Sequence, residues 1–253
     1  MNNKKINTSW GSVADNYDLV VEDDGGYHKE VILPNIIRLL NLKKGEKVLD
    51  LACGQGFFSG EFALTGALVT GVDVSPELID IAKRKYSTIN FLVSPAEDLS
   101  FLESGFFDKV TIILAIQNIE NIKKVFEECY RVLSKGGELF IIMNHPAFRI
   151  PRKSYWGFDE ENNIQYRRID GYLSEAKEKI DMNPGEIIDK KFTFSFHRSL
   201  QFYFKILKNC GFCVTNLEEW ISNKFSQEGP RKKAEDRARK EFPMFMMLEA
   251  LKK

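Results

Sequence analysis

The chain has 253 residues, of which 43% are hydrophobic and 28% charged, and this is enough apolar material for a large buried core. Its 36 basic and 36 acidic residues give a formal net charge of zero, which argues against tight nonspecific binding to nucleic acid. The amino end is polar and no apolar run approaches the roughly 18 residues that a membrane span requires, so a cytoplasmic enzyme without a membrane partner is expected.

Two helices are expected at the start of the chain. The first has an apolar face at helical spacing, formed by Trp10, Val13, Ala14 and Tyr17. Such a face serves plain core packing about as often as it serves a cap over a ligand. The second helix begins at Tyr27 and His28 and runs to Leu40, with a bend at Pro34 because proline lacks the N–H of a regular helical hydrogen bond.

The most informative stretch follows at residues 48–58, where a short apolar run ends in Asp50 and a glycine turn and then opens onto a helix. Glycines at 54 and 56 allow the backbone to approach a ligand closely, and the free amides of the helix start add a positive dipole end. A dehydrogenase fingerprint would place glycine or alanine where this chain has Ser59, and it would not need Asp50. The loop therefore predicts a nucleotide-type cofactor of another kind.

A second strand is expected at residues 67–72 and ends at Asp73, where a carboxylate suits the two hydroxyls of a ribose. Ser75 is a good N-cap and Pro76 a preferred first helical residue, so a helix should begin here. This arrangement would hold Asp73 at the edge of a cleft.

The pattern D-x-x-C-G-x-G at residues 50–56, followed by V-D-V-S-P at 72–76, resembles the class I S-adenosylmethionine (SAM) dependent methyltransferases. The match extends from about Ser9 to the C-terminus and is most specific over residues 46–80. It implies an α/β fold with a doubly wound, mostly parallel seven-stranded sheet, and SAM as the cofactor, with S-adenosylhomocysteine as its product. The expected organisation is an N-terminal cap and SAM-binding half at 1–145, an insertion at 146–197, and a C-terminal helix with an edge hairpin at 198–253.

The resemblance also implies which residues bind the cofactor. They are Tyr17, His28, Asp50, Ala52, Cys53, Gly54, Gly56, Asp73, Val74, Ala96, Glu97, Leu114 and Gln117. The loop after a third strand at 89–93 should hold the adenine, although Pro95 stands where many relatives carry an aspartate. The adenine amine would then bond to Glu97 or to a backbone carbonyl.

Further elements are expected in the family's order. A fourth strand at 106–114 is followed by a helix at 121–133 and a fifth strand at 138–143. A helix at 199–209, capped by Ser199, should bury Leu200, Phe204 and Leu207, and strands at 212–220 and 242–251 should form an antiparallel edge hairpin. The mixed-charge segment at 231–237 is expected to be a solvated helix or loop.

The insertion at 146–197 separates strand five from the next family helix by about fifty residues, and a loop of this length usually has its own structure and purpose. Phe192, Phe194 and Phe196 alternate with polar residues, which indicates a half-buried strand. Two uses remain open: a lid over the acceptor, or an arm that pairs two chains in a homodimer. On the lid interpretation, the acceptor should contact His145, Phe148, Trp156 and Tyr166.

His145 is the candidate general base, because it follows strand five at the cleft and titrates near neutrality. The same residue could instead orient the loop that begins at Pro146. The C-x-x-C spacing at 210–213 lacks a second pair or a histidine cluster, so no metal is expected; Cys210 should end a helix and Cys213 begin a strand. The favoured function is methylation of a small molecule, and the alternatives are an RNA or protein methyltransferase and a non-catalytic SAM-binding regulatory protein.

Overall fold

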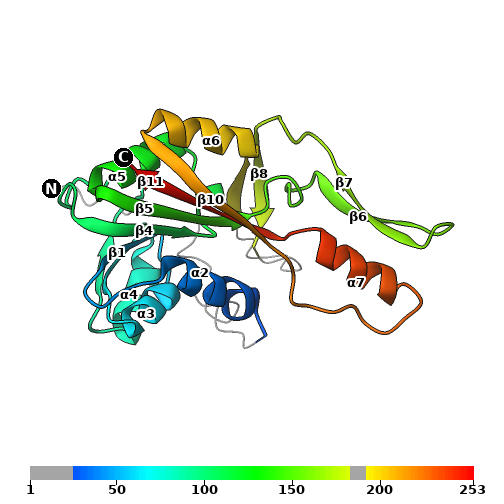
Figure 1. Ribbon diagram of the computed structural model, residues 1–253, viewed down its shortest axis with the longest axis horizontal. Coiled ribbons are helices and arrows are strands. Elements are labelled where there is room, and N and C mark those ends of the chain that lie inside the picture. Colours follow the sequence, from blue (N-terminus) through cyan, green and yellow to red (C-terminus); the bar gives the residue numbers. More distant parts are fainter. Residues whose placement is uncertain (1–24, 183–191) are drawn as a thin grey trace.

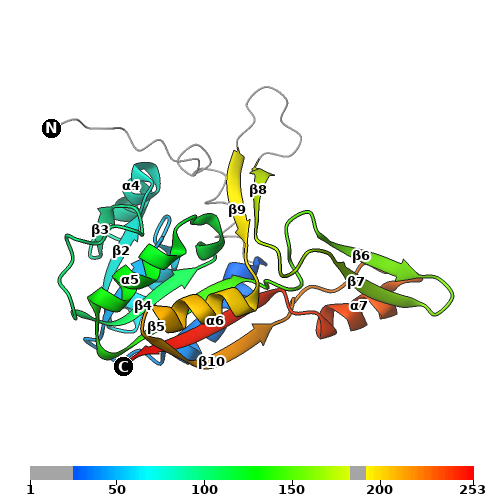
Figure 2. The same cartoon turned by 90° about the horizontal axis from the view of Figure 1, so that it is seen from above.

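The computed structural model describes residues 25–182 and 192–253, and the aromatic helix expected around Trp10 and Tyr17 lies outside them. Within the described residues, the chain forms a central sheet with helices on both faces and an arm that extends away from the sheet (Figures 1 and 2). No helix in these two ranges is long and apolar enough to cross a membrane.

The central sheet has seven strands in the order β10-β11-β5-β4-β1-β2-β3. Their bounds are β1 (Lys47–Leu51), β2 (Leu68–Asp73), β3 (Asn90–Val93), β4 (Phe107–Ile113), β5 (Leu133–Asn144), β10 (Phe212–Trp220) and β11 (Phe245–Lys252). The first five strands pair in parallel, whereas β11 runs antiparallel between β5 and β10. This confirms the doubly wound, mostly parallel sheet and the antiparallel strands at its edge.

Helices cover both faces of the sheet. Their bounds are the π-helical turn η2 (His28–Ile32), α2 (Leu33–Leu40), α3 (Phe57–Leu64), α4 (Pro76–Lys85), the 3-10 turn η3 (Ile116–Asn118), α5 (Ile122–Val132) and α6 (Leu200–Asn209). One buried cluster joins η2, α2 and α3 to the sheet, and a larger one joins α5 and α6 to the opposite face. Figure 1 shows these two helical layers on either side of the strands.

The alternation of side chains in β1 explains why this strand lies at the centre. Val48 packs in the cluster under α2 and α3, whereas Leu49 and Leu51 pack in the cluster under α5. All three side chains are fully buried. Burial of each contributes about 1.5 to 3 kcal/mol, so β1 holds the two layers together and fixes the loop that follows it.

The helix starts follow the local signals in the sequence. The Ser75 Oγ accepts a hydrogen bond from the Leu78 N–H at 3.3 Å and Pro76 is the first residue of α4, as expected. Asn121 caps α5 in the same way, by accepting from the Lys124 N–H. The helix that starts at His28 widens into a π turn just before Pro34, where the missing N–H would otherwise leave a carbonyl without its partner.

The arm is built from two distant parts of the chain. Strands β6 (Ser154–Asp159) and β7 (Ile164–Ile169) form a hairpin, and α7 (Lys232–Glu241) packs on β7. The ring of Trp156 meets the ring of Phe242 edge-on at 5.4 Å. Figure 2 shows all three elements extending beyond the end of the sheet, so the mixed-charge segment after residue 230 is a helix of the arm.

A second hairpin stands beside the sheet and consists of β8 (Ala176–Asp181) and β9 (Phe192–His197). The half-buried strand expected at the phenylalanines is present, but of their face only Phe196, at 9% exposed, is buried. Phe194 is 45% exposed, whereas Thr193 and His197 on the other face are each only 4% exposed. The phenylalanine face is covered by lysines from the paired strand, with the Lys179 Nζ 3.6 Å from the centre of the Phe192 ring.

Helix α6 is amphipathic as expected: Leu207 is fully buried and Leu200 packs against the core. Phe204, however, is 39% exposed, and Tyr203 is buried in its place. Ser199 occupies the N-cap position of α6, but its side chain accepts no capping hydrogen bond. The C-x-x-C segment is as expected: Cys210 ends α6, Gly211 turns with φ +95°, and β10 begins at Phe212.

Candidate active site

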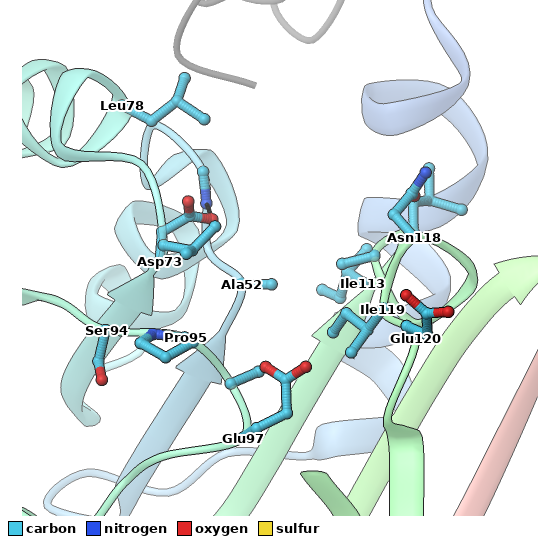
Figure 3. Close-up of a pocket in the computed structure, with 15 residues that line it drawn as sticks. Ala52, Asp73, Leu78, Ser94, Pro95, Glu97, Ile113, Asn118, Ile119 and Glu120 are labelled. Atoms are coloured by element: carbon cyan, nitrogen blue, oxygen red, sulfur yellow. Dashed lines mark hydrogen bonds between the residues drawn. The ribbon is translucent and has the colours of Figure 1, made fainter. Parts of the chain in front are cut away.

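A cavity of about 320 Å³ lies at the carboxyl ends of the parallel strands, between the loops that follow β1 and β4. The chain leaves β1 toward β2 on one side and returns to β4 on the other, and ligands of open α/β sheets bind at such a switch point. The lining residues are Ala52, Gly54, Asp73, Val74, Leu78, Ser94, Pro95, Ala96, Glu97, Ile113, Leu114, Ala115, Asn118, Ile119 and Glu120. We call this space the cofactor cavity (Figure 3).

The loop after β1 enters the cavity with unusual backbone geometry. Ala52 and Gly54 both line it, with φ values of +59° and +57°. Leu114, at the end of β4, has φ +53° and lines the opposite wall. Left-handed conformations of residues other than glycine carry a cost of about 1 kcal/mol or more and gather at functional sites.

Gly56 has a packing role that the sequence did not predict. Its φ is +83°, and a Cβ at this position would lie 2.7 Å from the ring of Phe91, so the glycine permits close packing of the loop on β3. Gly56 does not line the cofactor cavity. Of the two glycines in the motif, Gly54 is therefore the one that faces the cavity.

Asp73 holds the cofactor loop and faces the cavity at once. One carboxylate oxygen accepts from the Gly54 N–H at 2.9 Å and the other from the Ser75 N–H at 2.8 Å. Burial raises the pKa of this carboxyl, and the two N–H groups oppose the rise. Each oxygen keeps a lone pair for a further donor, so Asp73 can accept hydroxyls of a ligand in the position that the sequence predicted.

Asp50 is buried behind the loop, where its carboxylate accepts from the Ser59 hydroxyl at 2.6 Å and from the Thr111 hydroxyl at 3.1 Å. Burial raises its pKa to about 6, although both hydroxyls oppose this shift. The residue that departs from a dehydrogenase fingerprint, Ser59, thus has a specific partner in the acid of the motif. Asp50 supports the loop from behind and does not line the cofactor cavity.

A smaller cavity of about 30 Å³ adjoins the loop and is lined by His28, Asp50, Ala52, Cys53, Gly54, Gln55, Phe57, Phe58 and Ile113. Both polar atoms of the Gln55 amide are buried here, and neither has a hydrogen-bond partner within the part of the chain that the structure describes. Burial raises the pKa of the Cys53 thiol well above its usual range, so Cys53 is no nucleophile. Because Gln55 is the variable residue of G-x-G, the motif gave no reason to select it.

The loop after β3 and the turn η3 complete the cofactor cavity. Ala96 and Glu97 line it as expected, beside Pro95. Gln117 does not: its amide donates to the Asn144 carbonyl at 2.8 Å and accepts from the Asn144 N–H, and so ties η3 to the end of β5. Asn118 lines the cavity in its place. Figure 3 shows Glu97 facing Ile119 and Glu120 across the opening.

His145, the candidate general base, does not line the cofactor cavity. Its Nε2 lies 2.6 Å from a carboxylate oxygen of Glu219 on β10, and its Nδ1 accepts from the Ala147 N–H at 3.1 Å. Burial lowers its pKa, while Glu219 opposes the shift. With both ring nitrogens bonded to protein groups, His145 fits the alternative role of orienting the loop after β5.

The predicted acceptor residues Phe148, Trp156 and Tyr166 also lie outside the cofactor cavity. Phe148 stacks near His145, with ring centres 4.7 Å apart, and near Phe242. Trp156 packs on α7, and Tyr166 lies over Gly157 on the outer face of the arm and is 47% exposed. The structure therefore groups these residues with the arm.

The hairpin of β8 and β9 contacts the cofactor cavity instead. The Asn118 side chain donates to the Phe194 carbonyl at 3.0 Å, and the Lys177 Nζ pairs with the Glu120 carboxylate at 3.1 Å. Both Asn118 and Glu120 line the cavity. These contacts were not predicted, because they join residues more than fifty positions apart in the sequence.

Comparison with known proteins agrees with this geometry. A sequence profile for a methyltransferase domain matches residues 49–141. A demethylmenaquinone methyltransferase from Paenarthrobacter aurescens (strain TC1) is 31% identical over 152 residues, 60% of this chain and 60% of that protein. One from Chlorobaculum tepidum is 30% identical over 213 residues, 82% of this chain and 84% of the relative. The first alignment thus spans less than two thirds of the relative's length.

A solved structure is also similar. The crystal structure of an S-adenosylmethionine-dependent methyltransferase from Mesorhizobium loti superposes with a TM-score of 0.69 at 25% sequence identity, over 87% of this chain and 96% of that chain. Sequence and fold agree over most of both proteins. The chain therefore belongs to the class I S-adenosylmethionine-dependent methyltransferase family.

Proposed function

We propose that the protein transfers a methyl group from SAM to a small-molecule acceptor. The observation that carries this proposal is the convergence of Gly54, Asp73 and Glu97, from three successive loops, on one cavity at the switch point of the sheet. When bound, SAM supplies a methyl group already activated on a sulfonium. The chain then has to bind the cofactor, align the acceptor with that methyl and exclude water.

The residues present fit the parts of SAM. The Asp73 carboxylate has free lone pairs for ribose hydroxyls, and Val74, Leu78 and Ala96 offer apolar walls for adenine. The partnerless amide of Gln55 suits the amino and carboxylate groups of the methionine end. The carboxylates of Asp73, Glu97 and Glu120 around the cavity favour a cation such as a sulfonium.

A small-molecule acceptor is supported by the names of two relatives, both demethylmenaquinone methyltransferases. A balanced net charge also favours a small molecule over RNA. We leave His145 out of the proposed machinery because both of its ring nitrogens already have protein partners.

The test is transfer of label from methyl-labelled SAM into a metabolite extract, compared with tRNA and with a protein fraction. We expect label only in the small molecules. Asp73→Ala should weaken SAM binding by roughly 2 to 4 kcal/mol, because two charge-assisted hydrogen bonds are lost. Asp80→Ala is the matched control, since Asp80 is an exposed carboxylate on α4 outside the cavity. Label in tRNA or protein, or equal effects of the two variants, would contradict the proposal.

A further inference from the structure

Another cavity of about 30 Å³ adjoins η3 and is distinct from the one beside Gln55. Asn118 of η3 lines the cofactor cavity, whereas Gln117 of the same turn lines this other space. The other lining residues are Asn144, Pro146, Arg149, Pro151, Ser195, Phe196, His197, Arg198 and Tyr203. They belong to the end of β5 and the loop that follows it, to the end of β9, and to α6 with the residue two positions before it. The space lies beside η3 and the carboxyl end of β5, at the end of the sheet where open α/β folds bind ligands.

Arg198 is a buried cation in this wall. The residue is 5% exposed, and its Nη2 donates to the carbonyls of Ile119 at 3.0 Å and Glu120 at 2.7 Å. Its Nη1 is buried and has no hydrogen-bond partner in residues 25–182 and 192–253. A buried guanidinium whose charge and donors are only partly compensated is costly, so a missing partner is indicated.

Tyr203 is a second donor without a partner. Its side chain is fully buried, and its hydroxyl has no hydrogen bond within the described residues. Burial raises its pKa to about 12, and the neighbouring Arg198 opposes the rise. The hydroxyl is therefore protonated and able to donate at neutral pH.

The charges around this space favour an anion. Two arginines, Arg149 and Arg198, belong to the lining, and among the described lining residues there is no carboxylate. His197 contributes no charge at neutral pH, because burial lowers its pKa, and its Nε2 bonds to the Tyr172 carbonyl at 2.8 Å. A water molecule would fit the volume and satisfy hydrogen bonds, but it would leave the guanidinium without a counter-charge.

We propose that this space, which we call the anion cavity, binds an anionic oxygen of the methyl acceptor, either a carboxylate or an aryl oxyanion, through the Arg198 Nη1 and the Tyr203 hydroxyl. The assignment rests on the proposed function, because it names the acceptor's class. Arg198 would serve both ligands, since its other nitrogen holds the carbonyls of Ile119 and Glu120, two residues that line the cofactor cavity.

The test uses benzoate and its neutral counterpart benzamide as probes, titrated calorimetrically into the full chain in the presence of excess S-adenosylhomocysteine. Benzoate should bind and benzamide should bind at least about tenfold more weakly, the difference expected for a hydrogen bond to a charged group. Tyr203→Phe should weaken benzoate about tenfold without harming the fold, because the deleted hydroxyl has no protein partner. Tyr130→Phe is the matched control, since the Tyr130 hydroxyl bonds to the Lys253 carbonyl at the opposite end of the sheet.

Three results would overturn the assignment. Equal binding of benzoate and benzamide would show that no charge is recognised, and benzoate binding that is indifferent to Tyr203→Phe would place it elsewhere. Inorganic phosphate that binds as tightly as benzoate would indicate a site for free anions and not for an acceptor. A separate titration with S-adenosylhomocysteine distinguishes the two proposals: if it fails to bind while benzoate behaves as expected, the proposed function fails and an anion cavity remains.

Discussion

The loop after β1 and the arm differ in how far apart in the sequence several of their partners lie. Behind the cavity, Ser59 bonds to an acid nine positions away, and Gly54 bonds to one 19 positions away. In the arm, Arg231 pairs with Glu160 across 71 positions, and Trp156 packs on a ring from beyond α7. Short-range partners leave a motif that can be recognised in the sequence, whereas long-range partners leave none.

The two regions also differ in burial. The side chains of β1 next to the cavity are fully buried, whereas Tyr155, Trp156 and Tyr166 of the arm are 49%, 44% and 47% exposed. Regions with few buried apolar contacts open locally at a lower free energy than the core does. The sheet therefore fixes the position of the cofactor loops, and the arm can change without disturbing them.

The largest expected effect is on the loop itself. Gly54→Val should reduce S-adenosylhomocysteine affinity at least about 100-fold, because a branched side chain would enter the cavity and oppose a positive φ. Gly105→Val is the matched control, because Gly105 has φ +69° but has open space around it and lies outside the cavity. Calorimetry that gives wild-type affinity for Gly54→Val would show that this loop is not where the cofactor binds.

The next effect concerns Asp50, which supports the cofactor loop from behind. The pKa of Asp50 rises from 3.8 to about 6 on folding, so its contribution to stability is present below about pH 4 and is lost as pH rises through 6. Asp50→Asn should remove this dependence. Between pH 4 and 7, wild-type unfolding free energy should fall by roughly 3 kcal/mol relative to the variant. Parallel urea-unfolding stabilities across this range would contradict the account.

A smaller effect is expected in the arm. Trp156→Ala removes an edge-to-face contact with Phe242 and a cation–π contact with Arg167 at 4.9 Å, together worth about 1 to 2 kcal/mol. Hydrogen exchange should show lost protection at residues 154–169, while S-adenosylhomocysteine affinity stays unchanged. A loss of cofactor affinity would mean that the arm and the cavity are coupled. A specific loss of acceptor use would favour the lid interpretation of the insertion.

The smallest effect is expected at the phenylalanine face of β9. Lys177 lies over the Phe194 ring, 4.8 Å from its centre, and already covers part of this face. Phe194→Glu should therefore leave the molar mass in light scattering unchanged. Conversion of a dimer to a monomer would instead establish that the insertion pairs two chains in a homodimer.

Much of the cofactor half was predictable from the sequence because its signals are local. The ends of β2 and β4 fall within one residue of those expected, and the capping of α4 by Ser75 follows from the sequence alone. The motif did not separate the roles of its glycines, since the ring of Phe91, which excludes a Cβ at Gly56, comes from a strand 35 positions later.

The rest could not be predicted, because distant partners decide it. His145 looked available as a base because it follows strand five at the cleft, yet a carboxylate oxygen of Glu219 on β10 lies 2.6 Å from its Nε2. Helical spacing in α6 allowed more than one buried face, and packing against the sheet selected Tyr203 over Phe204. The phenylalanines of β9 alternate as a buried face would, but at Phe192 and Phe194 lysines of β8 cover the rings in place of a core.

The most direct test of the central claim is a calorimetric titration of the unmodified protein with S-adenosylhomocysteine and, separately, with NADH. We expect S-adenosylhomocysteine to bind at one site per chain, with Asp73 as the partner of its ribose, and NADH not to bind. Tight binding of NADH with none of S-adenosylhomocysteine would contradict the proposed function, although the sheet and its switch point would stand.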